Sequence, residues 1–155
     1  MKTGKWIAVL MMGMGIPAAA MAEGPLVRFE GGIGSQPLRA GGAPNAVLGV
    51  NPGGAPWVID RLSVEVKTDG RISVAGRGLL LGGGNGIGTT GNQSVRARLA
   101  CGGVFHDTAL VPLEPDGDFR IDDVLLPAPP VPCASPVLLI VSGGGSWFAA
   151  GIPKL

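Results

Sequence analysis

His106 is the only histidine of the chain and the residue best suited by type to acid–base catalysis. An exported hydrolase would pair it with a serine such as Ser135 or Ser146, because a neutral imidazole can accept the proton of an attacking hydroxyl. Asp107 follows directly, but successive residues of a strand point to opposite faces, so Asp107 is badly placed to orient His106. Ser146 also lacks the second glycine of a nucleophile elbow. We therefore predict no catalytic residue, and we expect His106 to be a surface histidine.

Carboxylates between residues 114 and 123 are the best candidates for metal ligands. Ca²⁺ prefers oxygen ligands and is common outside cells, which makes Asp116, Asp118 and Asp122 the calcium candidates of the chain. Their spacing lacks the loop length and the terminal glutamate of an EF-hand. Turn chemistry together with a solvated strand face accounts for the same residues. We therefore predict no metal site and no cofactor.

The segment Gly86-Ile87-Gly88-Thr89-Thr90-Gly91 matches the G-x-G-x-x-G pattern of dinucleotide-binding loops. In that fold a helix begins at the loop, and its N-terminus meets the pyrophosphate. Ser94–Cys101 instead alternates as a strand. The glycine-rich segment 82–91 is therefore predicted to be a mobile connection between strands, because glycine loses much conformational entropy when it is ordered.

The first 22 residues have the pattern of a secretory signal peptide, which is cleaved after Ala22. The apolar core is interrupted by glycine and is shorter than the roughly 20 residues that a transmembrane helix needs. The mature chain is therefore expected to be one domain, residues 23–155, secreted or periplasmic and not inserted into a membrane. The pattern consists of Lys2 and Lys5, an apolar run from Trp6 to Ile16, Pro17, and the small-residue site Ala20-Met21-Ala22.

Export places Cys101 and Cys133, the two cysteines of the chain, in a compartment where disulfides form and persist. Zinc would need two more soft or imidazole ligands, and the chain has a single histidine. Cys101 alternates in phase with Val95 and Leu99, so its sulfur is expected to point inward. We predict one disulfide, buried in the core.

Charge gives no indication of a nucleic-acid partner. The chain has 12 basic and 11 acidic residues, and two of the lysines precede the predicted cleavage site. Binding to phosphates needs clustered Lys and Arg, whereas the basic residues here are scattered singly. The expected partner is an unknown protein or a small ligand.

Glycine clusters separate apolar segments rich in Val, Ile and Leu, which predicts short strands joined by turns. Leu62, Val64 and Val66 alternate with polar residues, and the Asp-Gly turn at 69–70 predicts a hairpin with the return strand 71–74. A second hairpin is expected over residues 108–124. It enters at 110–113, turns at 114–118 and returns through Phe119 and Ile121.

The C-terminal part continues the β pattern. The proline-rich residues 127–132 are expected to form an extended linker, since proline cannot donate to a strand ladder. Val137–Val141 has no polar alternation, which predicts a central strand covered on both faces. Strands are also expected at 147–152 and at 26–30. Seven or eight short strands and one disulfide predict an all-β fold, an antiparallel β-sandwich of Ig-like or prealbumin-like type.

Residues 94–141 form a sequence of elements that resembles a known secreted fold. A strand ending in cysteine is followed by a strand bearing threonine, an Asp-Gly turn, a proline loop, a second cysteine and an apolar strand. This order resembles the prealbumin-like (transthyretin-like) and the pollen Ole e I-like β-sandwiches, although the further cysteines of the pollen family are absent here. The mature chain also resembles small secreted bacterial proteins with no assigned role.

Trp57 and Trp147 are expected in the core, because aromatic residues near strand starts are usually buried. The chain has no tyrosine, which argues against a carbohydrate-binding face. We predict a non-catalytic secreted binding or structural module whose ligand contacts the glycine loops. The alternative is a small secreted hydrolase using His106 with a serine. A serine hydroxyl within about 3 Å of the imidazole would favour the hydrolase.

Overall fold

The structure is a computed structural model that describes Gly13 and residues 24–155. The predicted signal peptide, apart from Gly13, lies outside the described residues. Within the described part the chain forms strands and no helix, and no segment there could cross a membrane as a helix. The strands are β1 (Pro25–Gly34), β2 (Trp57–Val58), β3 (Arg61–Lys67), β4 (Arg71–Arg77), β5 (Leu80–Leu81), β6 (Ser94–Cys101), β7 (Val104–Asp107), β8 (Val111–Pro112), β9 (Phe119–Val124), β10 (Val137–Ser142) and β11 (Trp147–Pro153).

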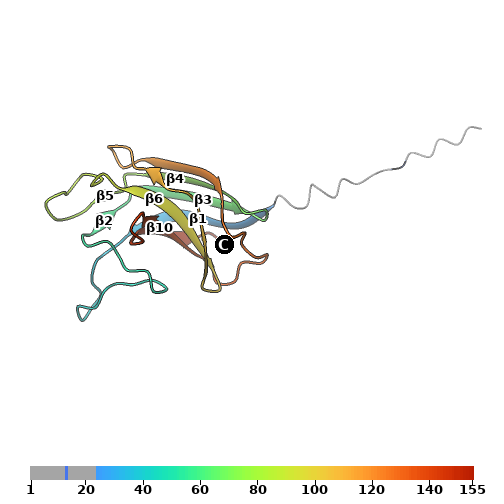
Figure 1. Ribbon diagram of the computed structural model, residues 1–155, viewed down its shortest axis with the longest axis horizontal. Coiled ribbons are helices and arrows are strands. Elements are labelled where there is room, and N and C mark those ends of the chain that lie inside the picture. The colour runs from blue at the N-terminus through green and yellow to red at the C-terminus, as the bar shows by residue number, and fades with distance from the viewer. Residues whose placement is uncertain (1–12, 14–23) are drawn as a thin grey trace, which may run out of the picture.

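Eight of the strands form one continuous antiparallel path in the order β7-β6-β10-β11-β1-β3-β4-β9. The sheet curls so that its two halves face each other like the layers of a sandwich (Figure 1). β8 pairs with β6 beside this path, and β2 and β5 form a small second sheet. The all-β antiparallel fold is therefore confirmed. β8 lies within the entering strand expected at 110–113. The short strand β5 was not predicted, because two residues are too few to show an alternation.

The inner face of the curled sheet carries the main core. Alternate residues of β3, β4, β6 and β9 point inward and are almost fully buried, as the period-2 pattern requires. Trp57 stacks on Phe148 with 4.0 Å between the ring centroids, so its expected place in the core is confirmed. Members of this core from the long strands are Phe29, Leu62, Val64, Val74, Leu99, Ile121, Leu138 and Ile140.

The first predicted hairpin is confirmed. β3 and β4 pair in register, with Val64 opposite Val74 and Val66 opposite Ile72. Gly70 closes the turn with φ of +90°, a conformation that glycine adopts without steric cost. The polar residues between the buried ones therefore all face outward on this half of the sheet.

The second predicted hairpin is wrong. Its turn does form, with the amide of Gly117 donating to the carbonyl of Glu114 at 2.8 Å. The two strands then separate, because β9 pairs with β4 over six residues while β8 pairs with β6. β8 has only two paired residues, one of them Pro112, which cannot donate to a ladder. The turn at 114–118 therefore connects the two opposite ends of the curled sheet.

β10 is buried on both faces, as its continuous apolar sequence predicted. Its outer face forms a second apolar cluster of Val50, Leu139, Val141 and Trp147, which residues 35–56 cover. The indole nitrogen of Trp147 donates to the carbonyl of Asn45 at 2.9 Å, and its backbone amide donates to the carbonyl at position 51. The prediction that Trp147 is a core residue is therefore confirmed.

The predicted disulfide is present. Cys101 at the end of β6 is bonded to Cys133, with their Cα atoms 4.9 Å apart and 32 positions apart in sequence. Cys101 is 4% exposed and belongs to the main core, as its phase in the strand predicted. Such a bond is typical of oxidising compartments outside the cytoplasm. It fastens the proline-rich segment to the end of β6.

Candidate functional site

His106 is buried, with 3% of its surface exposed, so the prediction of a surface histidine is wrong. The proline-rich segment lies along the edge strand β7 and covers the imidazole. Asp107 and Leu126 exchange two backbone hydrogen bonds of 3.0 Å there. His106 Nδ1 lies 2.6 Å from the carbonyl oxygen of Pro127. A carbonyl oxygen can only accept, so Nδ1 of His106 is the donor of this hydrogen bond.

The surroundings of His106 do not assemble a hydrolase site. Nε2 is buried and has no hydrogen-bond partner, and neither ring nitrogen bonds a serine hydroxyl in the part of the chain that is described. Ser135 lies in an exposed loop, and the amide of Ser146 donates to the hydroxyl of Ser142 at 3.1 Å. Neither Ser135 nor Ser146 is therefore hydrogen-bonded to His106.

Asp107 points to the opposite face of β7, as predicted, and forms an ion pair with Arg98. Nε and Nη2 of Arg98 donate to the two carboxylate oxygens at 2.8 and 2.9 Å. These hydrogen bonds raise the pKa of Arg98 above its ordinary value. The guanidinium also stacks over Phe105, 4.6 Å from the ring centroid. This pair therefore packs the outer face of β6 and β7.

Two of the three calcium candidates lie together, and the third does not. Carboxylate oxygens of Glu114, Asp116 and Asp118 all lie within 4.8 Å of one another. Asp118 already accepts the amide of Gly78 at 3.1 Å, and Asp116 accepts the amide of Asp118 at 3.0 Å. Asp122 lies apart on β9. Both aspartates of the cluster therefore take part in hydrogen bonds to backbone amides.

The glycine-rich segment 82–91 is hydrogen-bonded to the chain itself. The amide of Leu81 donates to the carbonyl of Thr89, and the amide of Gly88 donates to the carbonyl of Leu81, both at 2.8 Å. The Thr89 hydroxyl donates to the carbonyl of Gly86 at 2.7 Å. No helix follows the segment, and the amides of Gly88 and Thr89 donate to the carbonyls of Leu81 and Gly86. These amides are not arranged to hold a phosphate.

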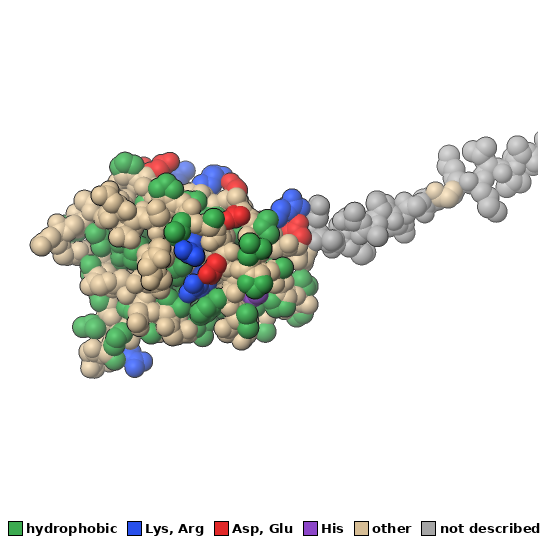
Figure 2. Space-filling view, in the orientation of Figure 1, with side chains coloured by type: hydrophobic (Ala, Val, Ile, Leu, Met, Phe, Trp, Pro, Cys, Tyr) green, Lys and Arg blue, Asp and Glu red, His purple; other side chains and the backbone are tan. Residues whose placement is uncertain are grey.

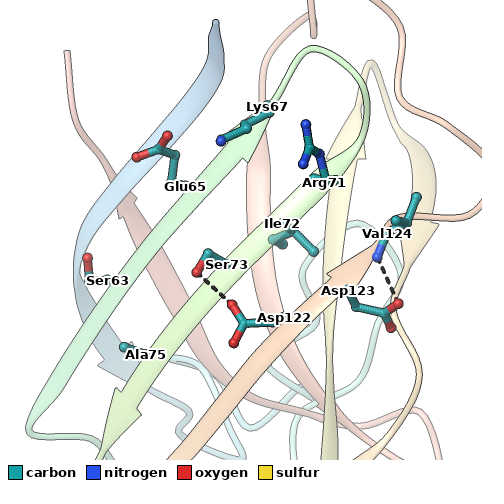
Figure 3. Close-up of a pocket in the computed structure, with 10 residues that line it drawn as sticks. All are labelled: Ser63, Glu65, Lys67, Arg71, Ile72, Ser73, Ala75, Asp122, Asp123 and Val124. Atoms are coloured by element: carbon teal, nitrogen blue, oxygen red, sulfur yellow. Dashed lines mark hydrogen bonds between the residues drawn. The ribbon is translucent and has the colours of Figure 1, made fainter. Parts of the chain in front are cut away.

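A charged groove lies on the outer face of β3, β4 and β9. Its volume is about 660 Å³, and Figure 3 shows its lining residues with their side chains on one side of the three strands. The lining consists of Ser63, Glu65, Lys67, Arg71, Ile72, Ser73, Ala75, Asp122, Asp123 and Val124.

Small side chains make the floor of this groove. Ser63 on β3 pairs with Ala75 on β4, and Ser73 on β4 pairs with both Glu65 on β3 and Asp122 on β9. Because the side chains of Ser63, Ser73 and Ala75 are short, the outer face is depressed where they lie, and longer charged side chains surround the depression. No aromatic residue lines the groove.

The charges of the groove are held in place by neighbouring groups. Asp69 accepts the backbone amide of Arg71 at 3.0 Å and its Nε at 2.7 Å, and these two bonds lower the pKa of Asp69. Asp122 accepts the hydroxyl of Ser73 at 2.9 Å. Glu65 faces Arg28 of β1 at 3.6 Å. Positive charge therefore lies at the hairpin end of the groove, and negative charge lies on β9 and on the flank of β3.

Sequence reasoning missed this groove. The outward residues of the first hairpin were identified as polar, but the pairing of β4 with β9 was not, so Asp122 was not placed beside Ser73. The available signal was the combination of serine and alanine with charged residues at outward positions. On the face seen in Figure 2, basic and acidic side chains form small mixed groups and no extended patch of one sign.

No family model, curated protein or solved structure matches this chain. The resemblance to prealbumin-like sandwiches therefore stays an expectation from the order of the elements.

Proposed function

We propose that this protein is a non-catalytic binding module, secreted or periplasmic, that holds a small polar ligand in the groove on β3, β4 and β9. The groove is the observation that carries the proposal. It combines a depressed floor, hydroxyl groups and side chains of both charges on a rigid sheet. The disulfide and the predicted signal peptide support export.

The groove fits a ligand better than the glycine loops do. The amides of Ile87, Gly88 and Thr89 in the glycine loop already donate to backbone carbonyls, whereas the groove presents charged side chains to solvent. Its lack of aromatic rings argues against stacking on a sugar, in keeping with the absence of tyrosine from the chain. The buried His106 with no serine partner in the described chain supports a binding role over a hydrolase.

The test is a ligand screen followed at single residues. The exported, oxidised protein would be mixed with a set of charged and zwitterionic small molecules, and backbone amide shifts would be recorded by NMR. We expect shifts confined to residues 63–75 and 120–124. Shifts confined to residues 82–91, or no shift with any compound at millimolar concentration, would overturn the proposal.

A further inference from the structure

Two charged side chains in the groove form no salt bridge among the described residues, although one of them, Lys67, lies near enough to Asp69 for the two charges to attract. Lys67 forms no salt bridge there, while Arg71 is held by Asp69. Asp122 accepts one hydroxyl hydrogen and meets no cation. Asp123, by contrast, uses one carboxylate oxygen for the amide of Ala109 and the other for the amide of Val124. Lys67 and Asp122 are therefore the two charges that remain available to a ligand.

These two charges lie at a separation that limits the size of a ligand bridging them. Asp122 is level with Ser73 and Glu65 across the sheet, and Lys67 lies two positions beyond Glu65 on β3. Two strand spacings and two strand positions put the Cα atoms of Lys67 and Asp122 about 12 Å apart. An extended peptide advances about 3.3–3.6 Å per residue, so roughly three residues span about 10 Å. The side chains of Lys67 and Asp122 span the rest of the distance between their Cα atoms.

Ser73 lies between the two charges and offers an acceptor. Its hydroxyl donates to Asp122 and keeps two lone pairs, so the oxygen can accept an N–H group from a ligand above it. Ser63 lies on the far side of Glu65 from Lys67, away from the line between the two charges. The floor therefore suits an amide rather than a hydrocarbon.

Building on the proposed groove function, we propose that the ligand is a short peptide of about three residues with free termini. Its ammonium group contacts Asp122, its carboxylate contacts Lys67, and an amide N–H group between them faces Ser73. Ligand side chains would point away from the sheet, since the groove is open on that side. Recognition then depends on the two charged ends and not on the sequence of the peptide. A diamine or a dicarboxylate satisfies only one of the two ends.

The direct test compares trialanine with its capped forms, using amide shifts and calorimetry on the exported protein. Each charged end forms a charge-assisted hydrogen bond, and a loss of 1.4 kcal/mol is tenfold in Kd. We therefore expect N-acetylation or C-amidation of trialanine each to weaken binding about tenfold. Equal affinity of trialanine and its doubly capped form would overturn the assignment.

Two variants locate the ends. Asp122→Asn is expected to abolish the difference between trialanine and its N-acetylated form while leaving the effect of C-amidation intact. Lys67→Gln is expected to do the reverse. Lys154→Gln and Asp60→Asn, which remove the same charges outside the groove lining, are expected to leave both differences unchanged. A loss of both differences in either control variant would contradict the assignment.

The outcome also separates this inference from the function on which it rests. If trialanine leaves the groove amides unmoved while another compound of the screen moves them, the peptide assignment is wrong and the binding function stands. If no compound moves them, both are wrong.

Discussion

The two halves of the curled sheet share one inner core but have opposite outer faces. The half made of β7, β6, β10 and β11 is covered outside by residues 35–56, and the proline-rich segment closes its edge at β7. The half made of β1, β3, β4 and β9 carries the open, charged groove. The difference follows from the outward residues, which are apolar on β10 and polar on β3 and β4. An apolar outer face must be covered, whereas a polar one stays free for a ligand.

The largest expected effect comes from uncovering the covered half. Trp147→Ala removes the largest side chain of the outer cluster and its bond to Asn45. We expect a loss of about 3–5 kcal/mol in the free energy of unfolding, measured by urea titration. Val124→Ala on the groove side, where Val124 is 44% exposed, is the matched control and should cost less than about 1 kcal/mol. Similar losses for the two variants would contradict the comparison.

The disulfide provides the second test, because it joins the proline-rich segment to β6 of the covered half. The double variant Cys101→Ser/Cys133→Ser is expected to lose about 2–5 kcal/mol of stability. Reduction of the wild-type protein should reproduce that loss in the same urea titration. Binding in the groove should be retained at temperatures where the variant is folded, since the bridge lies in the other half. Free thiols in the native protein would contradict this assignment.

The third test concerns the hydrogen bond between His106 and the carbonyl of Pro127 in the proline-rich segment. His106→Leu removes the donor to the carbonyl of Pro127 and, with it, an unpaired buried nitrogen, so the two effects partly offset. We expect a net loss of about 1 kcal/mol and faster amide exchange at Leu126, which pairs with the adjacent Asp107. A variant that leaves exchange at Leu126 unchanged would show that the imidazole does not hold the segment.

The smallest expected effect is electrostatic and lies in the open half. Hydrogen bonds from Arg71 lower the pKa of Asp69, so the folded state binds a proton there less readily than the unfolded chain. The resulting stabilisation is present above the unfolded value and is lost as the pH falls through the folded pKa. Asp69→Asn should therefore make stability less dependent on pH below about 4. The check is urea unfolding between pH 2 and 7, with Asp60→Asn as the control.

Much of the fold could be predicted because it depends on local patterns. Alternation identified the first hairpin and the inward face of β6, and an unbroken apolar run identified β10 as covered on both faces. Compartment chemistry and strand phase together predicted the bond between Cys101 and Cys133. Each of these signals is contained in a few neighbouring residues.

The errors concern pairings between distant segments. The second hairpin was predicted wrongly because β9 pairs with the longer strand β4 and not with β8. Nothing within residues 108–124 indicates this pairing. His106 was expected at the surface because its cover, the segment around Pro127, lies some twenty positions away. The groove was missed for the same reason, since Asp122 meets Ser73 only across that long-range pairing.

The sequence by itself determined the β class, the turn positions, the disulfide and which residues face inward, because strand period and turn chemistry act over a few residues. Only the tertiary structure decided which strands are neighbours, which outer face is covered and where unpaired charges converge. Those outcomes depend on which distant strands pair and which faces become buried. Each such contact depends on two segments of the chain, so neither segment predicts it alone. The open face of β3, β4 and β9, where Lys67 and Asp122 form no salt bridge among the described residues, is one such outcome.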